Sequence, residues 1–293
     1  MTTTTTSPVA DGTDPRPAHG GGRHPGAHEA YRLSYARVLR SEWIKLRTLR
    51  STWVGLASVV VVLVGFGLIA AGVSTGSVAP AGGGGGGGPR TQGPLDTVLL
   101  GANFGVLLLG IIGCLAGARE YASRMITATV AAVPTRGSVV TAKAVVLTAL
   151  VLPISLVATL IAFFAGTAVL EAGGATTVAL TDAGVLRAVL GTAVWLDVIA
   201  LLGLALGILL RNTAASIGTL IGGVIILPGI AGALLPSGGQ SVLKYLPSTA
   251  AESFTQLTPP AGDLSAGAGA LVLAAWLVLA IGGAVVAIRQ RDV

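Results

Sequence analysis

Two long stretches without a charged residue flank a short charged island in this chain. They cover residues 97–118 and 144–170, and the island covers residues 119–124. A helix needs about 20 apolar residues to cross the hydrocarbon core of a bilayer, and each stretch exceeds that length. The stretches are therefore expected to span a membrane, and the island to lie at its surface.

The composition extends this interpretation to the whole chain. Hydrophobic residues make up 53% of the sequence and charged residues 10%, whereas a soluble domain carries about 25% charged residues. We therefore predict an all-α membrane protein, because helices satisfy their own backbone hydrogen bonds in lipid. Windows with at most one charge give six transmembrane helices at about residues 52–74, 97–117, 144–166, 188–210, 213–235 and 266–288.

The distribution of basic residues predicts the orientation in the membrane. Of the 18 Lys and Arg residues, only Arg90, Arg187 and Lys244 fall on one side of the predicted spans. Basic residues mark the cytoplasmic side, so both termini and the charged island are expected in the cytoplasm of a multi-pass cell-membrane protein. The net charge of +6 then requires no nucleic acid, although it favours contact with anionic membrane lipid.

The segment before the first span has two parts. Residues 1–28 contain a Thr run with several Pro and Gly and no apolar core, which predicts a disordered cytoplasmic tail rather than a cleaved signal peptide. From residue 29 to 53, apolar and aromatic residues recur on one arc of a helix. This pattern predicts an amphipathic helix in the membrane interface, with Glu42 as the one acidic residue on its apolar arc.

Most enzyme chemistry is disfavoured by the residues present. The glycine run at residues 82–88 is a flexible linker rather than a phosphate loop, because no Lys in the chain follows a Gly. The three histidines lie in the Gly- and Pro-rich tail, and the lone Cys114 lies within a predicted span. We therefore expect no catalytic residues, no metal site and no ATPase site in this chain, and we disfavour a membrane enzyme.

Asp197 offers an alternative function. It is the only acidic residue deep within a predicted span, and buried carboxylates in a membrane are costly. It could belong to a translocation path, which would make the chain an ion-coupled secondary carrier. The other interpretation is a packing contact with Thr or Asn on a neighbouring helix.

The charged island predicts a short surface helix over residues 119–130, ending before Pro134. Glu120 and Arg124 are spaced as an ion pair on such a helix, and Tyr121 shares a face with Met125. The alternative is a solvated turn with a surface ion pair.

Several segments, in their order, resemble the permeases of bacterial ABC-2-type transporters. The stretch from Glu120-Tyr121 through Pro134 to Arg136, ending in Ala142-Lys143, is similar to the family's first cytoplasmic loop. The sequence departs from the family pattern at Arg124, where Gly is common, and at Thr127, where a basic residue is common. The further matches are Ser41-Glu42-Trp43 through Thr48, Leu210-Arg211-Asn212-Thr213-Ala214, Tyr245 through Ala250, and Arg291-Asp292.

This resemblance implies that residues 29–293 form the transmembrane domain of an exporter. Two separate ABC ATPase subunits would bind ATP and Mg, and a second permease, identical or different, would complete the pore. The pre-span helix and the loop would contact the ATPase, and short re-entrant helices would cap the exit. The residues implied at the ATPase-coupling surface are Glu120, Tyr121, Arg124, Arg136 and Glu42, with Glu42 pairing to a basic residue of the loop.

Overall fold

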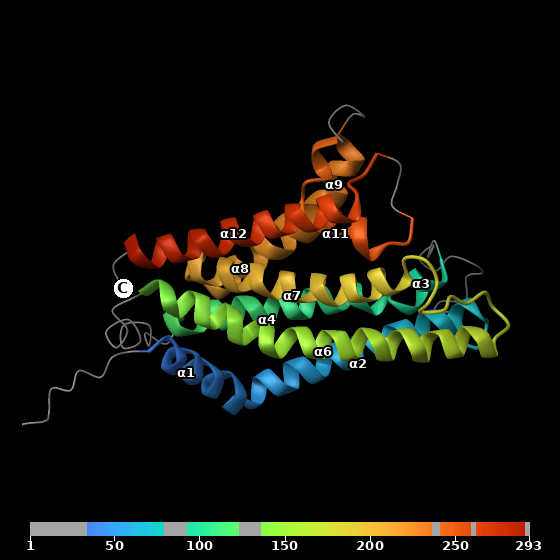
Figure 1. Cartoon of the computed structure of the whole chain (residues 1–293), viewed down its shortest axis with the longest axis horizontal. Coiled ribbons are helices and arrows are strands. Elements are labelled where there is room, and N and C mark those ends of the chain that lie inside the picture. The colour runs from blue at the N-terminus through green and yellow to red at the C-terminus, as the bar shows by residue number, and fades with distance from the viewer. Residues whose placement is uncertain (1–33, 79–92, 123–135, 236–240, 259–261, 291–293) are drawn as a thin grey trace, which may run out of the picture. The chain divides into compact units, whose positions relative to one another are not determined.

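The computed structural model describes residues 34–78, 93–122, 136–235, 241–258 and 262–290. Helices make up the regular structure of these residues, and no strand occurs among them (Figure 1). The predicted disordered tail and the glycine run lie outside the described residues. The helices are α1 (Tyr35–Thr48), α2 (Arg50–Ser74), α3 (Pro94–Val98), α4 (Gly101–Ala122), α6 (Arg136–Ala172), α7 (Val185–Leu210), α8 (Thr213–Leu220), the π-helix η1 (Ile221–Ile226), α9 (Leu227–Leu234), α11 (Pro247–Thr255) and α12 (Ala266–Gln290).

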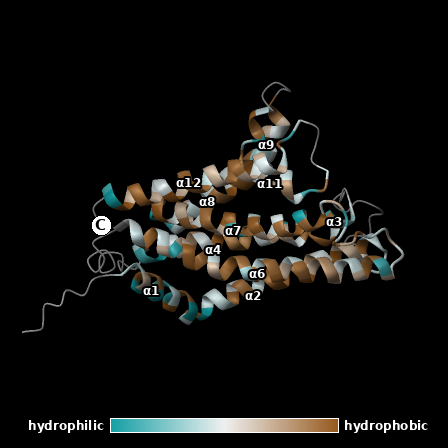
Figure 2. Ribbon diagram, in the orientation of Figure 1, coloured by the Kyte–Doolittle hydropathy of each residue, from teal (hydrophilic) through white to brown (hydrophobic). Residues whose placement is uncertain are grey.

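Six helical segments in the described part of the chain are long and apolar enough to cross a membrane, as the sequence predicts. The fifth consists of α8, η1 and α9 in succession. The second begins later than predicted, because residues 94–98 form the separate helix α3. The third is much longer than predicted, since α6 extends from residue 136 to 172. Figure 2 shows hydrophobic residues along the long helices and hydrophilic residues on α1 and near helix ends.

Large apolar side chains cover the outer surface of these helices. Val61, Leu271 and Val278 are each about 70% exposed. Leaving such side chains in water costs about 25 cal/mol for each Å² of apolar surface, whereas lipid accepts them. The fold is therefore that of a multi-pass membrane protein.

Glycines bring α4 and α7 into close contact at the centre of the bundle. A Cβ atom on Gly113 would meet the Ala200 carbonyl, and one on Gly203 would meet the Gly110 carbonyl. α7 is the most buried of the six spans, and it packs most extensively on α4. These glycines therefore serve helix packing, as small residues do in membrane bundles. A Cβ on Gly218, in the fifth span, would meet only open space.

Two ends of the bundle differ in the residues that they gather. At the first, the α1 end, Val38 of α1 packs on Val139 of α6, and Arg289 of α12 lies against Gly137. At the second, the α11 end, Arg187 at the start of α7 donates hydrogen bonds to carbonyl groups at the end of α11. The described helices therefore begin with α1 and finish with α12 at the same end, while the sidedness of that end remains a prediction.

Helix α11 extends from Pro247 to Thr255. Thr249 and Glu252 have the spacing of a capping box, yet the N-cap is Leu246 and no side chain caps the helix. Pro247 occupies the first helical position, where its fixed φ suits a helix and its missing N–H leaves no donor without a partner.

Candidate functional site

Helix α1 presents a buried stripe to α6, and Glu42 belongs to that stripe. Val38 packs against Val139 and Ala142. Glu42 follows Val38 by one helical turn and is only 3% exposed. The residue that interrupts the predicted apolar arc is thus one that faces protein, and a buried carboxylate requires a charged or hydrogen-bonding partner.

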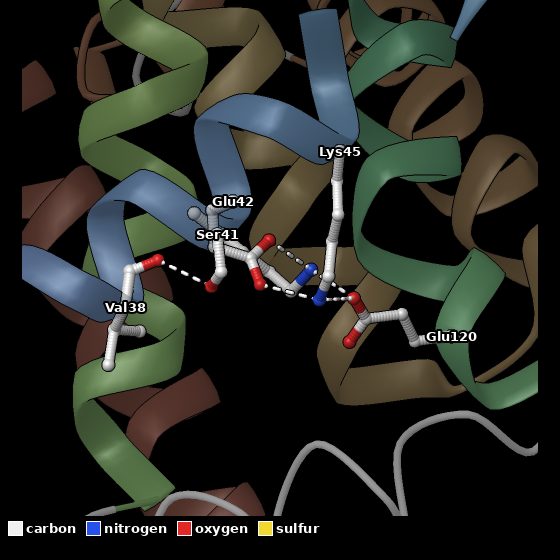
Figure 3. A network of polar contacts seen from close by, with 6 residues as sticks. Val38, Ser41, Glu42, Lys45 and Glu120 are labelled. Carbon is white, nitrogen blue, oxygen red and sulfur yellow. Dashed lines mark hydrogen bonds and ion pairs between the residues drawn. The ribbon is translucent and has the colours of Figure 1, made fainter. Parts of the chain in front are cut away.

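Two lysines supply those partners, and a second glutamate completes the cluster (Figure 3). Lys143 of α6 lies 2.8 Å from Glu42 Oε2 and 2.7 Å from Glu120 Oε1. Lys45, one turn beyond Glu42 on α1, lies 2.8 Å from Glu42 Oε1 and 3.0 Å from Glu120 Oε1. We call Glu42, Lys45, Glu120 and Lys143 the ion cluster. It holds two positive and two negative charges.

Burial makes this cluster more than a surface ion pair. The Glu42, Lys143 and Glu120 side chains are all largely buried, whereas the Lys45 side chain is 37% exposed. Partial burial lowers the pKa of Lys45, but its hydrogen bonds to Glu42 and Glu120 outweigh that effect and the pKa is raised. Lys45 therefore stays charged at neutral pH. Removing one member would leave a charge without compensation, which is costly at buried sites.

The ion cluster joins three helices. α1 packs mainly on α6. Glu120 lies in the last turn of α4, and Lys143 lies in the second turn of α6. Residues 123–135 connect α4 to α6. The ion pair between Glu120 and Lys143 therefore holds together the two helix ends that border this segment. Lys45 extends the connection to α1.

Tyr121 links the end of α4 to another part of the bundle. The guanidinium carbon of Arg211 lies 5.1 Å from the centre of the Tyr121 ring, which is a cation–π arrangement. Arg211 ends α7 with a positive φ of 53°, and the Asn212 side chain caps α8 by accepting a hydrogen bond from the Ala215 N–H. The tight turn between the fourth and fifth spans therefore contacts the last turn of α4, which also contains Glu120.

The structure differs from the sequence prediction in the surroundings of the residues expected to contact an ATPase. Residues 119–122 continue α4, so a separate surface helix does not begin at Arg119, contrary to the prediction. Residues 123–130, the rest of that predicted helix, lie outside the described residues. Arg124 lies outside the described residues, and its pairing with Glu120 stays a prediction. Arg136 is the first residue of α6, and its side chain is not described. Lys143, expected in the loop, lies inside α6.

These differences have a common cause. Apolar runs report the part of a helix inside hydrocarbon, while the helix itself continues into the polar interface. The backbone hydrogen bonds of α4 and α6 extend past the last apolar residue, and charged residues there can remain helical.

Three residues of this region were not predicted from the sequence as site residues, namely Lys45, Lys143 and Arg211. The sequence did contain a signal for the first. Lys45 follows Glu42 by three residues, which is a neighbouring position on a helix. The resemblance implied a basic partner for Glu42 in the loop; the partners in the structure are Lys143 of α6 and Lys45 of α1 itself.

Asp197 lies apart from the ion cluster, near the middle of α7. It is 6% exposed, and Thr148 of α6 is a polar neighbour of its carboxyl group. Within the described residues its Oδ1 has no hydrogen-bond partner. The predicted packing contact with a Thr on a neighbouring helix is compatible with this position, and so is a role in ion binding.

A scan against models of known protein families finds no match to this chain, and a search among curated proteins finds no similar sequence. The assignment of a function therefore depends on the motifs of the sequence and on the geometry of the helix bundle.

Proposed function

We propose that this chain is the membrane-spanning permease subunit of an ATP-driven exporter whose ATPase is a separate subunit. The six apolar spans support a transport role, and the absence of a Walker motif from the sequence favours an external source of energy. The resemblance to ABC-2-type permeases points to the same arrangement.

The ion cluster is the observation that carries this proposal. Glu120 and Lys143 stand at the two helix ends that border residues 123–135, and their charged atoms are 2.7 Å apart. An ATPase that displaces this segment would move the ends of α4 and α6 together. Lys45 would transmit the same displacement to α1, so that three helices respond to one contact. Packed helices shift as units and do not deform continuously, which suits the transmission of force.

The surface of the bundle leaves room for the remaining expected partners. The fifth span is the least buried of the six candidate spans, with 6% of its most apolar window covered by the rest of the chain. A second permease, identical or different, would cover this face. Arg40 and Arg47 are exposed on α1, where they suit contact with anionic lipid headgroups on the cytoplasmic side.

The decisive experiment combines purification with one substitution. The chain is purified from its native membrane in mild detergent, and any co-purifying Walker-type ATPase is reconstituted with it in liposomes. The Glu120→Lys variant is expected to insert normally but to lose ATP-dependent export, because it places a third lysine against Lys45 and Lys143. Glu171→Lys is the matched control, since Glu171 is exposed at the far end of α6.

Two results would contradict the proposal. One is export by Glu120→Lys at the wild-type rate. The other is full transport in liposomes that contain this chain alone.

The buried Oδ1 of Asp197 favours one second candidate, an ion-coupled carrier. A carrier needs no ATPase, so purified chain alone would then transport cargo when an ion gradient is imposed. Asp197→Asn would abolish that flux. Under the exporter proposal, neither the flux nor its loss is expected.

A further inference from the structure

A cavity of about 670 Å³ opens at the α11 end of the bundle. Its walls come from α3, α4, α7, α11 and the segment formed by η1 and α9. Small-molecule sites typically have volumes of roughly 300–1,000 Å³, so this cavity can hold a compact organic molecule. Neither Asp197 nor any member of the ion cluster lines it.

The cavity is negatively charged. Asp96 of α3 and Glu252 of α11 both line it, and among the described residues no Lys, Arg or His lines it. Asp263 adds a further negative charge near Glu252. Arg187 does not neutralise these groups, because its guanidinium donates to the carbonyls of Ser253 and Gln256 and it lines a separate, largely apolar cavity of about 430 Å³.

The ionised form of both carboxyl groups is disfavoured in this environment. Partial burial raises the pKa of Asp96. Glu252 is exposed to solvent, but desolvation by the surrounding protein raises its pKa, and the negative charge of Asp263 raises that pKa further. A cation placed in the cavity would stabilise both carboxylates. At the α1 end, by contrast, two lysines of the ion cluster already balance the two glutamates.

The rest of the lining is suited to an organic molecule. Trp195 and Leu99 contribute an aromatic and an aliphatic surface. Ser248 also lines the cavity, and its buried Oγ has no hydrogen-bond partner among the described residues. An unsatisfied buried hydroxyl is costly, so a ligand or water that bonds to it is favoured. Trp195 can also contact a cation through its ring face.

We propose that this cavity binds a monovalent organic cation, an ammonium group carried on an apolar body, with its charge between Asp96 and Glu252. The site itself does not depend on the exporter function. Its role as the place where cargo is held rests on the proposed function and would make amphiphilic amines the cargo class.

Ammonium groups reach a membrane protein from two sources, a free organic amine or the choline headgroup of a lipid. Both would be recognised by the same carboxylates. The binding experiment therefore begins in a neutral maltoside detergent without choline lipid and is repeated with added phosphatidylcholine or phosphatidylglycerol. Competition by phosphatidylcholine alone would assign the site to a lipid headgroup and would overturn its assignment to free amines.

The probe is benzyltriethylammonium, and benzenesulfonate is the anionic control of similar size. Calorimetry with the full chain at pH 7.5 is expected to show saturable binding of one cation per chain. We expect the Asp96→Asn/Glu252→Gln variant to bind it at least about tenfold more weakly, because both compensating charges are gone. Glu171→Gln, at the same end of the bundle but outside the cavity lining, is expected to bind as the wild type does.

Acidification provides a test that does not depend on a variant. Because the pKa values of Asp96 and Glu252 are raised, cation binding by the wild-type chain should weaken at a higher pH than ordinary carboxyl groups would dictate. If the double variant fails to fold, Asp96→Glu, which keeps the charge, and Glu252→Gln alone provide the comparison.

Equal binding of the cation and the anion would overturn the proposal, as would unchanged cation binding in the folded double variant. Failure of the exporter function is distinguishable from this outcome. If the chain binds the cation but never exports with an ATPase, the cation site is supported and the exporter function is contradicted. If the chain exports with an ATPase but does not bind the cation, only the cation site is contradicted.

Discussion

The two ends of the bundle differ in how their carboxylates are compensated. At the α1 end, Glu42 and Glu120 each accept hydrogen bonds from two lysines at 2.7–3.0 Å. At the α11 end, Asp96 and Glu252 line a cavity to which the described part of the chain contributes no basic residue. The same residue type is thus neutralised inside the protein at one end and left for a ligand or solvent at the other.

This difference separates a structural connection from a binding surface. A carboxylate with fixed internal partners holds helices together and has little capacity for an external cation. A carboxylate on a cavity wall, with its charge only partly compensated, can bind one. The comparison predicts that substitutions at the α1 end affect coupling and stability, while those at the α11 end affect ligand binding and pH dependence.

The largest expected effect comes from reversing one charge of the ion cluster. Glu120→Lys changes its net charge from zero to +2, so the ends of α4 and α6 repel each other. We expect ATP-dependent export to fall by about a hundredfold or more, which corresponds to about 2.7 kcal/mol. Flux assays in liposomes measure this, with Glu171→Lys as the control. If Glu171→Lys lost export to a similar degree, the effect of Glu120→Lys would not be specific to the α1 end.

Removing the most central lysine should have the next largest effect. Lys143→Met leaves Glu42 and Glu120 with Lys45 alone, and breaking a buried pair in this way typically costs about 3–5 kcal/mol. Denaturation in detergent, followed by circular dichroism, measures the change in unfolding free energy. The Lys143→Met/Glu42→Leu variant should recover much of that loss because it removes both charges. A single variant as stable as the wild type would show that the cluster does not hold the helices.

Neutralising the carboxyl groups of the cavity should stabilise the fold, whereas removing Lys143 should destabilise it. The raised pKa of Asp96 and of Glu252 means that folding favours the protonated form, so these groups lower stability once pH rises above the normal carboxyl range. Asp96→Asn/Glu252→Gln should therefore be slightly more stable than the wild type at pH 7, with no difference at low pH. Thermal unfolding across this range tests the sign, and a less stable variant at pH 7 would contradict it.

The smallest effect is expected between the two ends, at Asp197. Polar contacts between membrane helices contribute about 0.6 kcal/mol on average, so Asp197→Asn should change export by about threefold or less. The same liposome assay applies. A loss greater than that of Glu120→Lys would place the essential carboxylate inside the membrane and favour the ion-coupled carrier.

Part of the site was visible in the sequence. Glu42 stands out as an acid on an apolar arc, and Glu120 as an acid between two spans. Of their contacts, only the Glu42–Lys45 pair had a signal in the sequence, since the two residues are three apart on one helix. The contacts between helices had none, because Lys143 is 101 residues from Glu42 and Lys45 is 75 residues from Glu120. The cavity at the α11 end was not predicted at all. Asp96 was an unremarked residue before the second span, and only the packing of α3 and α11 brings it and Glu252 to one cavity.

The sequence by itself determined the six spans and the all-helical class. Hydrocarbon has a nearly fixed thickness and provides no hydrogen-bond partners, and a helix satisfies its own backbone groups. Each span is therefore a long apolar stretch that can be found in the sequence. The tertiary structure alone decided which charges are neutralised and which line a cavity. That outcome depends on how α1 packs on α6, and on how α11 packs on α7 and lines one cavity together with α3 and α4. Contacts between residues so far apart in the chain leave no local pattern in the sequence.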